Sequence, residues 1–271
     1  MRHFVLVHGA GHGAWCWYKV IAELKQAGHK VTALDMAASG IDRRQVEDVH
    51  SSDVEYSEPL FTFMASLPAG GEKVILVGHS MAGYTLCMAM ERFPEKVSVA
   101  VFLSAGMLGP DLTFEMVNKK YAEFSLMADP MDCQLIYGNG PDKPPTANLI
   151  GPKFMEAQFY RFSPRQKEWC FIGRIAYMQD LELGITLVRP CPTWDNEEAR
   201  KDTVLTVEKY GTVPRAYVVC DEEKDGAFQW WLIENNPPEE HFVIPGSDHM
   251  VMFSQPLLLC QYLLELGSKY L

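Results

Sequence analysis

The stretch GHSMAG, residues 78–83, stands where a strongly apolar run meets a region of helical periodicity. We predict a buried strand over residues 73–79 and a helix over residues 81–93, joined by a tight turn. A serine hydroxyl is a weak nucleophile, and such a turn exposes it and points it toward a substrate. Ser80 is therefore the predicted nucleophile. The usual pattern is Gly-x-Ser-x-Gly, whereas here Ala82 takes the last place and adds strain to the turn.

Strands and helices alternate on both sides of this turn. Short apolar runs predict buried strands, and longer periodic stretches predict helices. The other predicted strands span residues 3–8, 30–35, 97–104, 215–220 and 241–244. The other predicted helices span residues 17–27, 57–67 (with Ser57 as N-cap), 226–235 and 255–270. This alternation predicts an α/β fold, a mostly parallel sheet with helices on both faces.

The alternation breaks between residues 106 and 210, where Met, Pro and aromatic residues are frequent and no period-2 strand pattern appears. We interpret residues 106–210 as an inserted, mostly helical cap, and residues 1–105 together with 211–271 as the core domain. The apolar side chains of the cap either form its own core or line a pocket above Ser80. The sequence leaves both interpretations open.

The base that activates Ser80 is expected after the last strand. Of the eight histidines, only His249 follows that strand on a short loop before the final helix. This position matches the chain order nucleophile, acid, histidine that accompanies such serine turns. His249 is thus the predicted base. His241 begins the strand and suits a structural role, and the turn directs His79 away from Ser80.

An acid that orients the histidine is expected just past the strand that ends at Cys220. Residues 220–225 read CDEEKD and supply four carboxylates. Because buried like charges repel, at most one of them belongs to the site, and the others lie on the surface. The residues alone do not select among the four.

Backbone N–H groups are predicted to stabilise the negative charge that develops on a substrate oxygen. One is the Met81 N–H, directly after the nucleophile and at a helix N-terminus. The other is the Ala10 N–H, in the glycine-rich loop after the first strand. Gly9 lets the backbone of this loop approach the substrate closely. Gly9, Ala10 and Met81 are therefore the predicted substrate-binding residues.

A rival pattern overlaps the same loop. Residues 9–14 (GAGHGA) fit G-x-G-x-x-A after a first strand, and Asp35 ends the second strand, where a ribose-binding acid would lie. This dinucleotide-binding alternative leaves Ser80 and His249 without a role. Trp15 is also bulky for a helix start that cradles a pyrophosphate.

Composition narrows the class of protein. The chain has 271 residues, of which 48% are hydrophobic and 22% charged, which suits one α/β domain with a cap. A formal net charge of −11 disfavours nucleic acid and anionic membranes as partners. Seven scattered cysteines without a Cys-x-x-Cys pair, and no apolar run long enough for a signal or a membrane span, predict a cytoplasmic protein. Neither a metal-ligand spacing nor a Walker loop is present, so we expect no metal and no cofactor.

Four stretches carry a resemblance to a known family: VLVHGAGHGAWCWYK at residues 5–19, VGHSMAG at 77–83, EKVSVAVFLSA at 95–105 and SDHMVM at 247–252. With them the chain resembles the plant methylesterase family, which includes salicylate methylesterases, an indole-alkaloid aldehyde esterase and the α/β-type hydroxynitrile lyases. The resemblance spans nearly the whole chain. It implies an α/β-hydrolase fold with a cap, no cofactor, hydrolysis of small, often methyl, esters, and a homodimer.

The resemblance also assigns residues by position. Ser80 and His249 fall on the family's nucleophile and base, and Ala10 and Met81 on its oxyanion donors. The family's acid is an aspartate in a Cys-x-Glu-Asp-Lys pattern, and the matching residue here is Glu223.

Departures from the family keep alternatives open. A glutamate is one methylene longer than an aspartate, and the loop after it is slightly shorter than usual, so Asp221 and Asp225 remain alternatives to Glu223 as the acid. Residues 165–179 look like an insertion in the cap, which limits what the resemblance implies about the shape of the pocket.

Together these features predict a serine carboxylesterase that hydrolyses small, mainly methyl, esters of plant specialised metabolites or hormones. If the substrate is a β-carbonyl ester, the released acid loses carbon dioxide readily. One alternative is a carbon–carbon lyase of the hydroxynitrile lyase type, but those relatives carry Thr in place of Gly9 and Lys in place of Met250. The other alternative, a slow-turnover ligand-binding sensor, gains if Glu223 fails to orient His249.

Overall fold

The structure of the chain is a computed structural model. It describes residues 1–49, 53–124, 129–162, 171–193, 201, 203–223 and 226–270.

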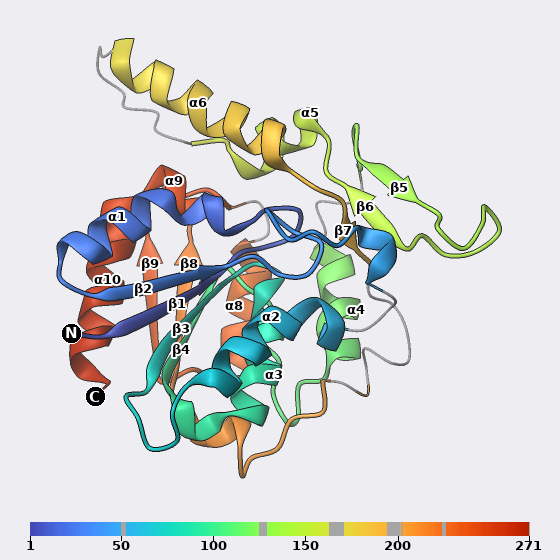
Figure 1. The fold of residues 1–271 in the computed structure, drawn as a ribbon. Coiled ribbons are helices and arrows are strands. Elements are labelled where there is room, and N and C mark those ends of the chain that lie inside the picture. The colour runs from blue at the N-terminus through green and yellow to red at the C-terminus, as the bar shows by residue number, and fades with distance from the viewer. Residues whose placement is uncertain are drawn as a thin grey trace.

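Six parallel strands form the central sheet (Figure 1), in the spatial order β2-β1-β3-β4-β8-β9. Their bounds are β1 His3–Val7, β2 Lys30–Leu34, β3 Val74–His79, β4 Val97–Leu103, β8 Arg215–Cys220 and β9 Glu240–Ile244. All five pairings are parallel, so the carboxyl ends of the strands meet at one edge of the sheet. The loops that follow β1, β3, β4, β8 and β9 therefore converge there.

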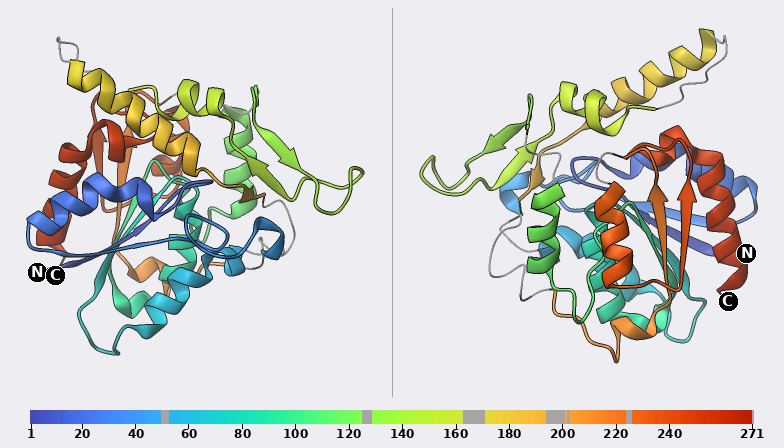
Figure 2. Two further views of the ribbon diagram at one scale, coloured as in Figure 1. Left: turned by 45° about the horizontal axis from the view of Figure 1, so that its top comes forward. Right: turned by 180° about the vertical axis from the view of Figure 1, so that it is seen from behind.

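Helices cover both faces of the sheet (Figure 2). One face carries α1 (Tyr18–Gln26), after a 3₁₀ turn at Ala14–Trp17, together with α9 (Val251–Ser254) and α10 (Pro256–Lys269). The other face carries α2 (Asp53–Ser66), α3 (Ala82–Arg92) and α8 (Gly226–Asn235).

The strands read as continuous apolar runs because alternate side chains pack into two different cores. In β3, Val74 and Leu76 pack with α2 and α3, whereas Ile75 and Val77 pack with α1 and α10. All six residues of β3 are buried. The predicted fold class, a mostly parallel sheet with helices on both faces, is confirmed.

Helix α2 begins at Asp53, four residues before the predicted start. Ser57 is therefore wrong as an N-cap. It lies inside the helix, is fully buried, and its hydroxyl is 2.9 Å from the hydroxyl of Thr85 on α3. A buried serine that bonds a neighbouring helix satisfies its hydroxyl without capping.

Most of the segment between β4 and β8 lies beyond the carboxyl ends of the strands (Figures 1 and 2), whereas residues 203–214 return to the amino end of β8. Its main elements are α4 Phe114–Phe124, β5 Gln134–Ile136, β6 Ala147–Leu149, α5 Pro152–Phe154, a π-helical turn at Met155–Phe159, α6 Phe171–Leu187 and β7 Cys191–Pro192. Strands β5, β6 and β7 form an antiparallel sheet that the sequence did not reveal. They have only two or three residues each, too few to display a period-2 pattern.

The predicted boundaries of the cap, residues 106–210, stay a prediction, and the segment is called the proposed cap below. The expected insertion at residues 165–179 lies partly outside the described residues, and its remaining part belongs to α6. Across the described part of the chain, no helix is long and apolar enough to cross a membrane.

Candidate active site

Ser80 sits in the turn between β3 and α3 with a φ of +56°. A non-glycine residue in the left-handed region is strained, so surrounding contacts must hold it there. The Ser80 N–H donates to the Leu103 carbonyl at the end of β4, and the Ser80 carbonyl accepts from the N–H groups of Gly83 and Gly106, all at 3.1 Å. These three bonds fix the serine at the carboxyl edge of the sheet.

The glycine that this turn requires is Gly83. A Cβ at Gly83 would lie 1.9 Å from the Gly106 carbonyl oxygen, which no side chain tolerates. Ala82 instead begins α3, is fully buried and packs in the core beneath the helix. The departure from the usual pattern is thus accommodated, because the close approach of the backbone occurs one residue later.

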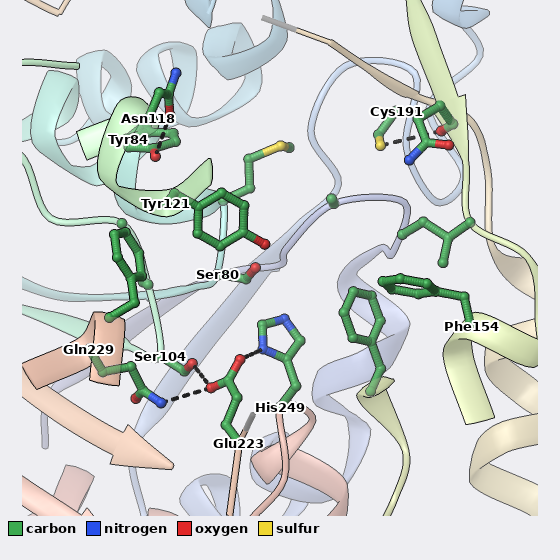
Figure 3. Close-up of a pocket in the computed structure, with 18 of the residues that line it drawn as sticks. Ser80, Tyr84, Ser104, Asn118, Tyr121, Phe154, Cys191, Glu223, Gln229 and His249 are labelled. Atoms are coloured by element: carbon green, nitrogen blue, oxygen red, sulfur yellow. Dashed lines mark hydrogen bonds and ion pairs between the residues drawn. The ribbon is translucent and has the colours of Figure 1, made fainter. Parts of the chain in front are cut away.

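His249 follows β9, and its imidazole lies between Ser80 and Glu223 (Figure 3). The His249 Nδ1–H donates to Glu223 Oε1. Because a carboxylate only accepts, this bond places the proton on Nδ1 and leaves Nε2 as the basic nitrogen. Both side chains are buried, with 8% of each residue exposed, so their bond is shielded from water.

Glu223 is held by two more donors. The Ser104 hydroxyl and the Gln229 side-chain amide both donate to its Oε2, the latter at 2.9 Å. The Gln229 side chain also makes two hydrogen bonds to the last residue of β8. It accepts from the Cys220 N–H at 3.0 Å and donates to the Cys220 carbonyl at 3.1 Å. One amide side chain therefore ties the strand end to the carboxylate that orients His249.

The structure distinguishes among the carboxylates of this loop. Asp221 is exposed and accepts from the Ser247 N–H at 3.2 Å. Glu222 is exposed as well. Asp225 lies outside the described residues. Of those described, Glu223 is the one that reaches His249, as its match to the family's aspartate implied.

The neighbouring histidine, His79, turns its ring toward the loop that carries His249. Its Nε2–H donates to the His249 carbonyl at 2.8 Å, and its ring lies 4.6 Å from the His249 ring. Burial holds the pKa of His79 well below its ordinary value, so the ring is neutral. It supports the loop that carries His249.

The loop after β1 comes close to the serine turn. A Cβ at Gly9 would be 2.9 Å from His79 Nδ1 and 3.0 Å from the Ser80 Cβ, so only glycine allows this approach. The carbonyls of residues 9–11 each accept a hydrogen bond. The Gly9 carbonyl accepts from His8 Nδ1 at 2.8 Å and the Ala10 carbonyl from His12 Nδ1 at 2.8 Å. The Gly11 carbonyl accepts from the Arg189 N–H at 2.9 Å. The peptide planes of the loop are thus fixed.

Ala10 and Met81, the predicted oxyanion donors, both line the cavity at Ser80. Met81 directly precedes α3, so its N–H lies at the positive end of the helix dipole. Within the described residues, neither N–H finds a hydrogen-bond acceptor. Two such donors beside a serine suit an oxygen that gains negative charge. Gly9, the third predicted substrate-binding residue, lines a smaller void next to them.

The cavity above Ser80 has a volume of about 260 Å³ and mostly apolar walls. Among the described residues that line it there is neither Lys nor Arg. Its polar groups besides the serine, histidine and glutamate include the Tyr84 hydroxyl, which donates to Asn118 Oδ1 at 3.0 Å (Figure 3). The other Phe and Tyr side chains of the wall come from Phe114, Tyr121, Phe154, Phe159, Tyr217 and Phe228.

The dinucleotide alternative does not fit. Asp35 turns its carboxylate toward the 3₁₀ turn at Ala14–Trp17 before α1, where it accepts from the Ala14 N–H at 2.7 Å. A carboxylate in this place repels a pyrophosphate, and it is not directed at a ribose. A Cβ at Gly13 would lie 2.7 Å from Asp35 Oδ1, so this glycine leaves room for the carboxylate.

Sequence reasoning missed Ser104, Gln229 and Phe159. Ser104 ends a predicted strand at the same edge as Ser80, which was a usable signal. Gln229 lies within a predicted helix, and nothing in the sequence around it indicates a role in the site. Phe159 stacks on the His249 ring with centroids 4.5 Å apart, from a segment whose structure the sequence did not predict.

No group of three or more His, Cys, Asp or Glu residues that could hold a metal occurs among the residues described.

Comparisons with known proteins agree with the fold. The family model "Alpha/beta hydrolase family" matches residues 4–261. "Methyl jasmonate esterase 1" of Vitis vinifera is 48% identical, over 99% of this chain and 98% of that protein. A variant of tomato methylketone synthase I, complexed with β-ketoheptanoate, is 43% identical, over 100% and 99% of the chains, with a TM-score of 0.89. Polyneuridine aldehyde esterase is 39% identical, over 98% and 99%, with a TM-score of 0.84.

Proposed function

The chain belongs to the alpha/beta hydrolase family, and on this premise we propose that it is a serine carboxylesterase that hydrolyses small, mainly methyl, esters of plant metabolites or hormones. The observation that carries the proposal is the alignment of Ser80, His249 and Glu223 at the floor of an apolar cavity. Relatives named as esterases support the same activity.

In the proposed reaction, His249 Nε2 removes the proton of Ser80 as its oxygen attacks the ester carbonyl. The Ala10 and Met81 N–H groups stabilise the oxygen that becomes negative. His249 then donates its proton to the leaving alcohol. A water, deprotonated by the same histidine, releases the acid and restores Ser80. Glu223 stays ionised and stabilises the imidazolium.

A second step, decarboxylation, is proposed for β-carbonyl substrates. A solved relative is a methylketone synthase complexed with a β-keto acid. The described residues that line the cavity include neither Lys nor Arg, so they offer a product carboxylate no permanent counter-cation. An apolar site without a counter-charge favours a reaction that removes the carboxylate. Hydrolysis of a methyl β-keto ester with one water would release methanol and the β-keto acid, and the acid would then lose carbon dioxide and leave a ketone, with its proton transferred to the α-carbon.

The two alternatives receive less support. Two positions disfavour the lyase. The threonine that the lyases carry in place of Gly9 would press against His79 Nδ1. The lysine that they carry in place of Met250 would place a charge in the fully buried core, which is costly. The slow-turnover sensor gains if Glu223 fails to orient His249, whereas the two side chains are hydrogen-bonded.

The test is hydrolysis of p-nitrophenyl acetate, methyl jasmonate, methyl salicylate and a methyl β-keto ester by the wild type and Ser80→Ala. Ser98→Ala is the matched control, because Ser98 is buried near the amino end of β4 and donates to the Val74 carbonyl. We expect wild-type turnover, a loss of at least about a thousandfold in Ser80→Ala, and an unchanged kcat in Ser98→Ala.

Product analysis separates the steps. Ketone formation faster than spontaneous decarboxylation of the free acid supports the second step, and accumulation of the acid contradicts it. A wild type that hydrolyses no ester, or a Ser80→Ala variant that retains the rate, would overturn the esterase proposal. Release of cyanide from mandelonitrile would point to the lyase instead.

A further inference from the structure

Residues 159–162 of the proposed cap hold both sides of the loop that carries His249. The Met250 N–H donates to the Phe159 carbonyl at 3.3 Å, and the Phe162 N–H donates to Asp248 Oδ2 at 2.6 Å. The two residues that flank His249 are therefore both bonded to this segment. Phe159 also stacks on the His249 ring at 4.5 Å with an interplanar angle of 28°. The base is thus held by the cap as well as by the core.

The same segment reaches the oxyanion loop through Tyr160. The Tyr160 hydroxyl lies 2.9 Å from His12 Nε2, while His12 Nδ1 donates to the Ala10 carbonyl at 2.8 Å. Because a carbonyl only accepts, His12 carries its proton on Nδ1, and its Nε2 accepts from the tyrosine. Burial lowers the pKa of His12 to about 4, so the ring is neutral near pH 7 and this direction of donation persists.

A third contact ties the segment to the acid loop. Arg161 Nη1 donates to the Glu222 carbonyl at 3.2 Å, one residue before Glu223. Four consecutive residues thus bond the loops that carry the oxyanion donor, the acid and the base. Tyr160 is fully buried, and Gly184 of α6 makes room for it, since a Cβ there would lie 2.5 Å from its hydroxyl.

We propose that residues 159–162 form a brace that positions the reacting groups, with Tyr160 and His12 as the positioning residues that hold the Ala10 peptide. This inference rests on the proposed function, since it assigns roles within the same site. A catalytic donor displaced by a fraction of an ångström loses much of its effect, because its advantage comes from preorganisation. The proposed cap would therefore control the rate of the reaction, in addition to forming the wall of the cavity.

The critical variant is Tyr160→Phe, which removes one hydroxyl and keeps the ring. The matched control is Tyr210→Phe, because Tyr210 is equally buried and donates to the Leu108 carbonyl at 2.5 Å outside the site. Two readouts are needed: ester turnover, and the rate at which a fluorophosphonate labels Ser80. The labelling reaction uses the serine, the base and the oxyanion donors without requiring ester hydrolysis.

We expect Tyr160→Phe to lower kcat and the labelling rate about tenfold, with KM within about twofold. Tyr210→Phe should keep both rates near the wild type. His12→Asn retains a donor in the place of Nδ1 but cannot reach Tyr160. It should show the same loss, and the double variant no further loss, because both break one connection. Gly184→Ala, which pushes the hydroxyl away without altering either partner, should lower both rates as well.

Normal rates in folded Tyr160→Phe, an equal loss in Tyr210→Phe, or a change confined to KM would overturn the brace. If Tyr160→Phe does not fold, His12→Asn and Gly184→Ala decide by the same criteria. A wild type that is labelled at Ser80 but hydrolyses no ester refutes the proposed function alone. The ratios of labelling rates then still test the brace.

Discussion

The Gln229 side-chain amide donates at 2.9 Å to Glu223, the carboxylate that accepts from His249. Both residues are buried, and the same amide group pairs with the N–H and the carbonyl of Cys220. A buried amide that satisfies three groups is costly to remove, because each partner is left without a replacement from water.

Gln229→Leu should therefore impair both stability and rate. We expect a decrease in the free energy of unfolding of about 1–3 kcal/mol in urea titrations. We also expect kcat to fall about tenfold, since Glu223 loses a donor that holds its position. Gln255→Leu serves as control, because within the described part of the chain the Gln255 side chain makes a single hydrogen bond, an exposed one of 3.3 Å to the Gly246 carbonyl. Equal effects in both variants would contradict a specific role for Gln229.

Glu223→Gln should leave the fold intact and nearly abolish turnover. An amide in place of the carboxylate no longer stabilises the imidazolium and permits the wrong tautomer of His249, which in a serine protease lowers kcat by roughly 10⁴-fold. Asp221→Asn tests the competing acid and should keep kcat within about threefold, because its carboxylate is exposed. A larger loss in Asp221→Asn than in Glu223→Gln would reverse the assignment.

Position along the chain predicted much of the site, because parallel strands bring their carboxyl ends together. Ser80, Ala10 and His249 each follow a predicted strand, and the structure brings all three to one edge. The resemblance to plant methylesterases is confirmed by relatives that are 48% and 42% identical over 99% of the chain. The catalytic roles themselves stay predictions until the variants are measured.

Other features depend on packing that no local pattern encodes. The choice of Glu223 among neighbouring carboxylates is a matter of burial, which sets it against His249 and leaves Asp221 in water. Tyr160 reaches His12 across 148 positions of sequence. The true start of α2 escaped prediction for a similar reason, because Ser57 bonds another helix instead of capping its own.

The serine turn predicts opposite outcomes for two neighbouring substitutions. Gly83→Ala should abolish activity or folding, since its methyl would collide with the Gly106 carbonyl. Ala82→Gly restores the usual pattern, yet it should lower stability by about 1–2 kcal/mol, through a lost buried methyl and a more flexible helix start. Its kcat should stay within a few-fold. Thermal unfolding and p-nitrophenyl acetate hydrolysis check both, and a tolerated Gly83→Ala would disprove the steric argument.

The last prediction concerns pH. Burial raises the pKa of Asp248 to about 6 from an ordinary value of 3.8, although the Phe162 N–H bond opposes the shift. The folded protein then binds this proton more tightly than the unfolded chain does. The stabilising contribution is complete below pH 3.8 and is lost as the pH rises through 6. Above that, the buried charge costs about 3 kcal/mol, at about 1.4 kcal/mol per pKa unit.

Asp248→Asn should remove this cost, since a neutral amide oxygen can still accept from the Phe162 N–H. We expect the variant to be more stable than the wild type at pH 7.5, by up to about 3 kcal/mol, and the gain to shrink toward zero as the pH approaches 4. Urea titrations at several pH values measure this difference directly. Asp248→Ala is the control, because it removes the charge and the acceptor together. A gain in Asp248→Asn that is independent of pH, or a loss at pH 7.5, would show that Asp248 does not carry a destabilising charge in the folded protein.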